Sequence, residues 1–139
     1  MSIVDEMAQY LHNQGVGIFD PAGVGGNIFI GKLPQDPDEA IVLTQTGGVL
    51  NDIKHSYDTI SVQVRVRGTQ DPRTGLVIAE SAYNYLHGFG SSTFMGGGTW
   101  VVSCTALGPP GSIGVDENGR YEYTINLHIE VWLKTIHRE

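Results

Sequence analysis

Two stretches of the chain alternate apolar and polar side chains residue by residue, at 57–68 ("YDTISVQVRVRG") and at 121–133 ("YEYTINLHIEVWL"). A period of two predicts a strand with one buried face. At about 3.3 Å per residue the second strand would be roughly 40 Å long, which exceeds the roughly 35 Å diameter expected of a compact chain of this size. We therefore expect its far end, from His128 to Leu133, to overhang the subunit and meet a neighbour. The alternative is that Trp132 covers a patch of its own subunit.

Two other segments follow the helical period. Residues 2–15 place apolar side chains three and four positions apart, with a start at Ser2 and Asp5 that resembles a capping box. Residues 69–88 contain Asp71 at a favoured N-cap position and Pro72 at the first helical position, where its missing N–H costs nothing. Both segments are predicted to be helices.

Shorter β-rich runs complete the pattern, at 27–33 ("NIFIGKL"), 39–47 ("EAIVLTQTG") and 99–107 ("TWVVSCTAL"), and the glycine-rich segment 108–120 is predicted to be a loop. The resulting order is α-β-β-β-α-β-β. This order predicts an α+β fold: a two-layer sandwich with a mostly antiparallel sheet of about five strands and two helices on one face. The length of 139 residues predicts a single domain over residues 1–139.

The charge balance narrows the possible partners. Fifteen acidic against eight basic residues give a net charge of −7, so the general field of the chain repels nucleic acid. One cysteine excludes an internal disulfide framework. The sequence contains neither a leader pattern nor an apolar run near 18 residues, so we expect an unprocessed protein without membrane contact.

The candidate motifs for catalysis, metal binding and nucleotide binding in the sequence are incomplete. The run "GNIFIGK" at 26–32 matches part of a phosphate loop, but Leu33 follows where Ser or Thr is needed. Cys104 is in line with strand hydrophobes and is predicted to be buried and inert. The remaining candidates are predicted to be ordinary histidines and solvated loop acids: His12, His55, His87, His128, His137, Asp36, Asp38, Glu39, Asp116 and Glu117. We expect no catalytic residue, no metal ligand, no cofactor and no enzymatic activity.

The polar faces of the two alternating strands carry residues that are candidates for an interface. Arg65 and Arg67 share one face, and the last strand has Glu122 and Glu130 on its equivalent face. The charges could pair across strands within one subunit or across a subunit boundary. Trp132 is an aromatic residue on the same polar face, a common feature of interfaces. Arg65, Arg67, Glu130 and Trp132 are therefore the predicted interface residues. We expect both arginines to be exposed, so that changing both to glutamate weakens assembly and leaves the monomer folded.

The element order, the run "VQVRVRG" leading into "DPRTGLVIAESAYNYLHG", and the late segment "PPGSIGVDENGRYEYTINLHIEV" together resemble the tail terminator, or minor capsid, proteins of long-tailed bacteriophages. The resemblance extends from Ile3 to about Leu133. It implies a structural virion protein that forms a ring, usually a homohexamer, on the end of the growing tail tube. This ring ends tube polymerisation and then joins the tail to the head connector.

The resemblance also implies partners and location: other copies of the chain, the tail tube protein and head connector proteins, at the head-proximal end of the virion tail after assembly in the host cytoplasm. No nucleotide or metal cofactor is implied. Little carries over residue by residue, since Arg65 and Arg67 match the basic strand positions of the family only loosely. An acidic channel would let DNA pass without specific binding.

Other functions stay open at this point. A head-completion (head–tail connector) protein or a tail-tube subunit would also assemble, but in a different stoichiometry or into open tubes. A small ligand-binding α+β domain would use the polar face of the sheet as its site. A solution mass near 90 kDa, six times the 15.0 kDa chain, would favour the ring.

Overall fold

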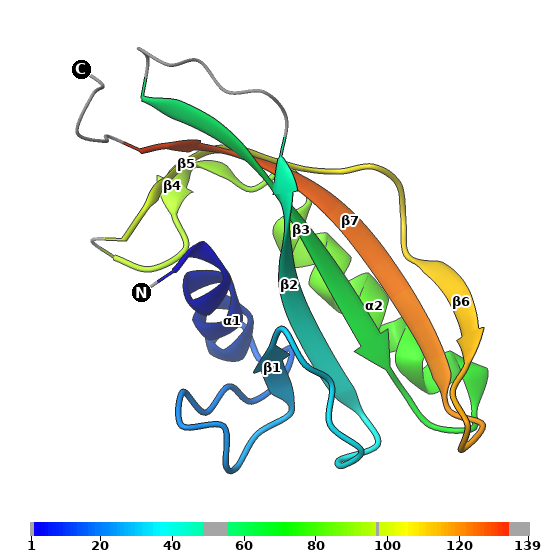
Figure 1. Cartoon of the computed structure of the whole chain (residues 1–139). Helices are drawn as coiled ribbons and strands as arrows, with labels where there is room; N and C mark the ends of the chain where they lie inside the picture. Colours follow the sequence, from blue (N-terminus) through cyan, green and yellow to red (C-terminus); the bar gives the residue numbers. More distant parts are fainter. Residues whose placement is uncertain (1, 49–55, 97, 134–139) are drawn as a thin grey trace.

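A computed structural model describes residues 2–48, 56–96 and 98–133, which form two helices and seven strands (Figure 1). In chain order the elements are α1 (Ile3–Asn13), β1 (Ile28–Ile30), β2 (Ala40–Gly48), β3 (Tyr57–Arg67), α2 (Pro72–Leu86), β4 (Gly90–Thr93), β5 (Trp100–Ala106), β6 (Gly111–Val115) and β7 (Tyr121–Trp132). The strands belong to one sheet with the order β1-β2-β3-β7-β5-β4, and β6 pairs with β7 beside this path. All pairs are antiparallel except β1 with β2. The α+β prediction is confirmed.

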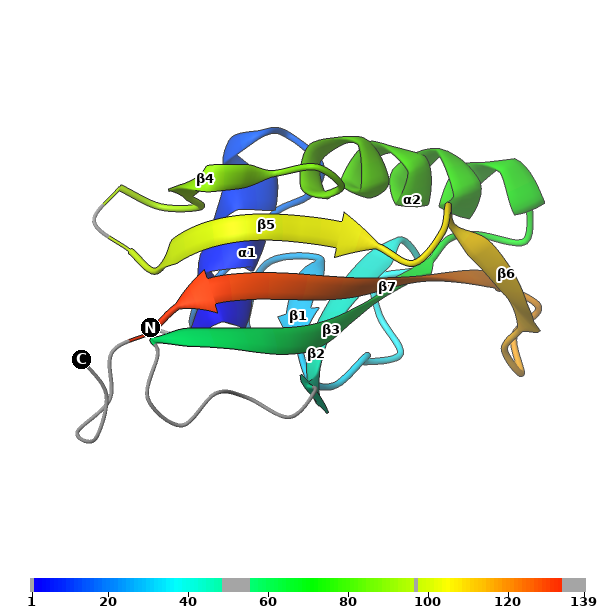
Figure 2. The same cartoon turned by 90° about the horizontal axis from the view of Figure 1, so that it is seen from above.

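The long strand β7 is the centre of the sheet, which explains its length. It pairs with β3 from Tyr57↔Trp132 to Arg67↔Glu122. On its other side it pairs first with β6 and then with β5, as far as Trp100↔Trp132. The predicted overhang of its far end is therefore wrong, because residues 128–132 have strand partners of the same chain on both sides. A strand can exceed the expected diameter of the molecule because the sheet is curved and elongated (Figure 2).

Two strands, β4 and β6, were not predicted. Both lie in segments rich in glycine and serine, "GSST" and "GSIGV", which lack the alternation of a half-buried strand. They are strands because a long neighbour offers its backbone groups for pairing: β5 pairs with β4, and β7 with β6. Tertiary pairing thus overrides weak local propensity.

Both helices pack on one face of the sheet and share one hydrophobic core with it (Figure 2). The predicted caps are present. The Ser2 side chain accepts from the backbone N–H of Asp5, whose own side chain accepts from the backbone of Ser2, and the Asp71 side chain accepts from the N–H of Arg73. Alternating side chains of β3 and β7 face the helices and are fully buried: Val62, Val64, Val66, Ile125, Leu127, Ile129 and Val131. Among the described residues, no helix lies on the opposite face of the sheet.

The start of α2 is fixed by a close contact between two glycines. Gly68 follows β3, and a Cβ atom there would lie 2.6 Å from the Cα of Gly75 and closer still to its nitrogen. Because both neighbours are backbone atoms, a side chain would push α2 away from the sheet. Gly68→Ala is expected to lower the free energy of unfolding by about 1–3 kcal/mol, measured by urea denaturation. Gly108→Ala is the matched control, since nothing lies within 4 Å of a Cβ atom at that position; equal stability of both variants would contradict the close packing.

Candidate assembly surfaces

One end of the sheet is held together by buried guanidinium groups. Arg67, at the end of β3, is only 4% exposed and donates to three backbone carbonyls of the loop 31–39. Its Nε reaches the carbonyl oxygen of Asp38 at 3.0 Å, and its Nη2 reaches those of Pro37 at 2.5 Å and Gln35 at 3.3 Å. Burial lowers the pKa of Arg67, and the nearby charge of Arg120 lowers it further. Arg67 therefore holds the loop 31–39 in place through hydrogen bonds within the same chain.

Arg120, in the β6–β7 hairpin, also holds the loop 31–39 in place. Its Nε donates to the Asp116 carboxylate at 2.8 Å, and its Nη1 donates to the carbonyl oxygen of Gln35 at 2.6 Å and to the Asp38 carboxylate at 3.1 Å. Asp116 also accepts the N–H groups of Asn118 and Arg120 and so closes the hairpin turn. The loop 31–39 and the hairpin tip 116–120 are thus joined into one preorganised surface, the arginine-anchored end.

Arg65 completes this charge network. Its Nε donates to the Glu122 carboxylate on β7 at 2.6 Å, with the Arg65 side chain 41% exposed and that of Glu122 8% exposed. The cross-strand alternative for the charged residues therefore holds for this pair. The expectation that both arginines are exposed is wrong for Arg67, because the loop 31–39 covers it. A double change of Arg65 and Arg67 to glutamate would consequently disturb folding as well as any contact between subunits.

The opposite end of the sheet carries a row of exposed aromatic side chains. Trp132 on β7 is the register partner of Tyr57 on β3 and of Trp100 on β5. Directly opposed residues project from the same face of a sheet, and this face is the one without helices. The three side chains are 46%, 45% and 47% exposed for Tyr57, Trp132 and Trp100. Glu130 lies two residues from this aromatic row on the same face of β7 and is half-buried.

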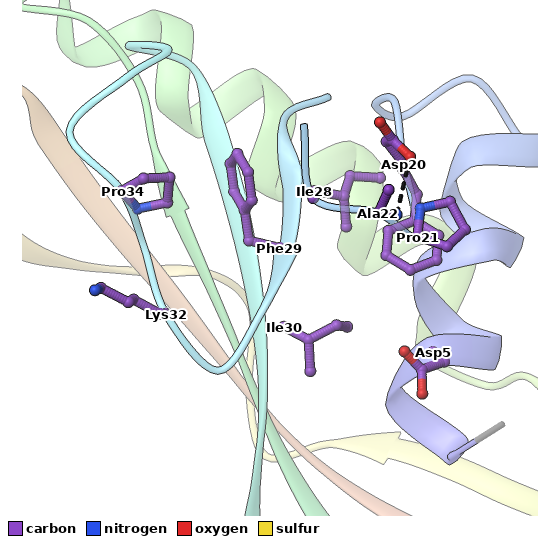
Figure 3. Close-up of a pocket in the computed structure, with 11 residues that line it drawn as sticks. Asp5, Asp20, Pro21, Ala22, Ile28, Phe29, Ile30, Lys32 and Pro34 are labelled. Carbon is purple, nitrogen blue, oxygen red and sulfur yellow. Dashed lines mark hydrogen bonds between the residues drawn. The ribbon is translucent and has the colours of Figure 1, made fainter. Parts of the chain in front are cut away.

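A groove of about 490 Å³ lies between the first turn of α1, the segment 19–23 and β1 (Figure 3). Its lining combines apolar side chains, among them Phe29 and Ile30 from β1, with the charged residues Asp5, Asp20 and Lys32. Its two acids already have structural partners: Asp5 bonds with Ser2, and Asp20 accepts the N–H groups of Ala22 and Gly25. These backbone hydrogen bonds, that from Ala22 foremost, lower the pKa of Asp20. The groove thus offers shape without a convergent pair of acid and base.

The remaining chemical candidates have structural roles. Burial raises the pKa of the Cys104 thiol to about 12, so the thiolate that could react is suppressed. The Nδ1 atoms of His12 and His87 accept the backbone N–H groups of Phe19 and Ala106 at 3.0 and 2.9 Å. His55 and His137 lie outside the described residues. The predicted strand in "GNIFIGK" is confirmed: β1 ends at Ile30, and Gly31 follows it with a φ of +77°.

The described part of the chain contains neither a metal-binding cluster nor a membrane-spanning helix. In residues 2–48, 56–96 and 98–133, no three His, Cys, Asp or Glu side chains are grouped so that they could hold a metal ion. Within the same residues neither helix is long and apolar enough to cross a membrane.

The sequence analysis did not identify several residues that the structure shows to be important. Arg120 lies in a predicted loop, where a buried charge has no local signature, and its partners in the loop 31–39 are about 80 residues away. Tyr57 and Trp100 begin their strands, and only the register of the sheet brings them beside Trp132. Glu6 on α1 is buried, and its Oε1 accepts the N–H of Thr99 at 2.7 Å. Its position within the apolar stripe between Ile3 and Met7 was the available signal.

Comparison with known proteins assigns the chain to a family. A search of curated proteins finds no match. A family model described as bacteriophage tail terminator protein matches residues 10–131, from α1 through nearly all of β7. The match includes both arginines of the predicted interface and ends just before Trp132. Proteins of this family are structural components of the phage tail, and therefore of the virion, that act at the tail tube. The chain belongs to the bacteriophage tail terminator protein family.

Proposed function

We propose that copies of this chain form a six-membered ring that caps the tail tube, ends its polymerisation and then joins the tail to the head. The observation that carries this proposal is the family match over residues 10–131. The ring itself needs two different contact surfaces on each copy, because a closed ring is built from heterologous contacts. Each copy has different surfaces at the two ends of β3 and β7, the arginine-anchored end and the aromatic row.

The preorganised loops support a docking role for the arginine-anchored end. Burying Arg67 and Arg120 costs desolvation energy, which hydrogen bonds to fixed loop atoms offset. A loop that is already ordered loses less entropy when it binds a partner. The exposed acids of this end, Asp36, Asp38, Glu39 and Glu117, would meet the tube or the connector without a change in loop conformation.

The proposal gives different roles to the four predicted interface residues. Trp132 and Glu130 lie at the aromatic end and would contact a neighbouring copy directly. Arg65 is partly exposed beside Glu122 and can contribute at the other end. Arg67 would act indirectly, by holding the loop 31–39. With a net charge of −7, a ring of these chains would let DNA pass without specific binding.

Tube growth in vitro tests the proposal. The cognate tail tube protein is polymerised with and without the purified chain, and tube lengths are measured by electron microscopy. We expect added chain to stop elongation at a stoichiometry of one ring per tube. Tubes that incorporate the chain and continue to grow would favour a tail-tube subunit, and tubes that ignore it would favour a head-completion protein; either result contradicts the proposal.

A further inference from the structure

The basic side chains of this acidic protein are concentrated in one cavity, of about 350 Å³, at the arginine-anchored end. Of the eight basic residues, three lie outside the described part of the chain, and four of the other five line this cavity: Lys32, Arg65, Arg67 and Arg120. Of the fifteen acids, two lie outside the described part, and only three of the other thirteen line it: Asp116, Glu117 and Glu122. The lining therefore has a net charge of +1 in a chain whose total is −7. Such a cavity favours a negatively charged ligand.

Two of the four cations keep N–H donors for a ligand. Lys32 is exposed and has no hydrogen-bond or ion-pair partner among the described residues. Figure 3 shows its side chain directed away from α1. Arg65 donates from Nε to Glu122 Oε1 at 2.6 Å, and its Nη2 lies 2.5 Å from the same oxygen. Because both contacts use one side of the guanidinium, the N–H groups of Nη1 are left over.

The other two cations supply a fixed positive charge. Arg67 and Arg120 are buried, and their hydrogen bonds to the loop 31–39 and to Asp116 hold them in place. Burial, and after it the charge of Arg120, lowers the pKa of Arg67. A negative group in the cavity would offset this repulsion between two guanidinium groups. Since both are already ordered, binding would cost little side-chain entropy.

The charge of the cavity fits one carboxylate better than it fits nucleic acid. One carboxylate balances the net charge of the lining. A DNA duplex carries one charge per about 1.7 Å of its axis, so it would also bring phosphates against Glu117 and the exposed acids of the loop 31–39: Asp36, Asp38 and Glu39. A protein loop can place a single carboxylate in the cavity and turn hydrogen-bond donors to the acids around it. The charge pattern therefore favours a protein partner.

We propose that this cavity binds one aspartate or glutamate side chain of the tail tube protein, with Lys32 and Arg65 as the donors. The family acts at the tail tube, and this makes the tube protein the partner that the comparison supports. The inference rests on the proposed function and gives the docking role of the arginine-anchored end a chemical basis.

Two substitutions at the cavity should change tube binding in opposite directions. Lys32→Gln removes a donor and a positive charge, and Glu117→Gln removes a negative charge that repels the incoming carboxylate. Each change is expected to alter the affinity by about 2- to 5-fold per copy, the size of one exposed ion pair. Because several copies dock on one tube end, Lys32→Gln should weaken binding of the assembled ring at least about 10-fold. Glu117→Gln should strengthen it, and Lys32→Arg should bind like the wild type.

Binding is measured by co-sedimentation with preformed tubes of the cognate tail tube protein, at two salt concentrations. Arg73→Gln and Glu80→Gln are the matched controls, since both residues are exposed on α2 and neither lines the cavity. Both controls should bind like the wild type. Urea denaturation monitors folding, and sedimentation without tubes monitors association between copies. Higher salt should reduce the difference between Lys32→Gln and Glu117→Gln.

The outcomes separate the inference from the proposed function. Unchanged binding of both variants would overturn the inference, and so would opposite signs, which would mean that the partner contributes a cation. Loss of association between copies of Lys32→Gln without tubes would place the carboxylate on a second copy. Duplex DNA that binds the wild type but not Lys32→Gln would place a phosphate in the cavity; both of these results would overturn the inference.

The wild type tests the proposed function separately. A wild-type chain that binds tubes without ending their growth would contradict the proposed function, while the signs of the two variants would still decide the inference. A wild-type chain that does not bind tubes would overturn both.

Discussion

Replacing Arg67 with glutamate is expected to lower the free energy of unfolding by at least about 3 kcal/mol, because it leaves buried acceptors facing a carboxylate. The guanidinium of Arg67 donates to the backbone carbonyl oxygens of Gln35, Pro37 and Asp38, and its side chain is shielded from water. A carboxylate in its place would repel all three oxygens and the nearby acids of β7 and the β6–β7 hairpin. Urea denaturation, followed by circular dichroism, measures the loss.

Arg73→Glu is the matched control for the same chemical change. The Arg73 side chain is 86% exposed in the first turn of α2, so its replacement should change stability by no more than about 0.5 kcal/mol. If Arg67→Glu unfolds at the same urea concentration as Arg73→Glu, then Arg67 does not hold the loop 31–39 as described.

Ile125→Ala is expected to cost about 2–4 kcal/mol, through the cavity it leaves in the core. Ile125 is 1% exposed on β7, the strand with neighbours on both sides, and its register partner on β3 is the fully buried Val64. The surrounding strands cannot close the gap without breaking the sheet pairing, so little relaxation is expected. The free energy of unfolding in urea is the direct measurement.

The adjacent residue gives the control. Asn126 points to the helix-free face and is exposed, and its side-chain oxygen accepts a long hydrogen bond of 3.4 Å from Gln63. Asn126→Ala should therefore stay within about 0.5 kcal/mol of the wild type. Similar losses for both variants would mean that the two faces of β7 are not distinguished by burial, contrary to the structure.

The parts of the fold that local patterns determine were predictable. The alternation in β3 and β7, the capping box of α1 and the Asp71–Pro72 start of α2 each depend on residues within one segment. β4 and β6 were not predictable, since their pairing is set by β5 and β7 rather than by their own residues. The overhang of β7 was inferred from length alone, and the pairing of Trp132 on both sides overturns it.

The surfaces were predictable only in part, for the same physical reason. Trp132 could be recognised as an aromatic residue on a polar face, but its neighbours Tyr57 and Trp100 depend on the strand order. Arg67 follows the polar alternation of β3, and nothing in that strand shows that the loop 31–39 folds over it. Alternation assigns a side chain to a face of the sheet, whereas its burial depends on what covers that face.

The position of the chain on assembled tails tests the central claim most directly. Tails assembled with an affinity-tagged chain can be labelled with gold and imaged by electron microscopy, with untagged tails as the control for labelling. If the chain is the terminator of the tail tube, gold should appear at one end of each tube, on the end that later carries the head. Label along the whole length of the tube, or label on heads without tails, would contradict the account.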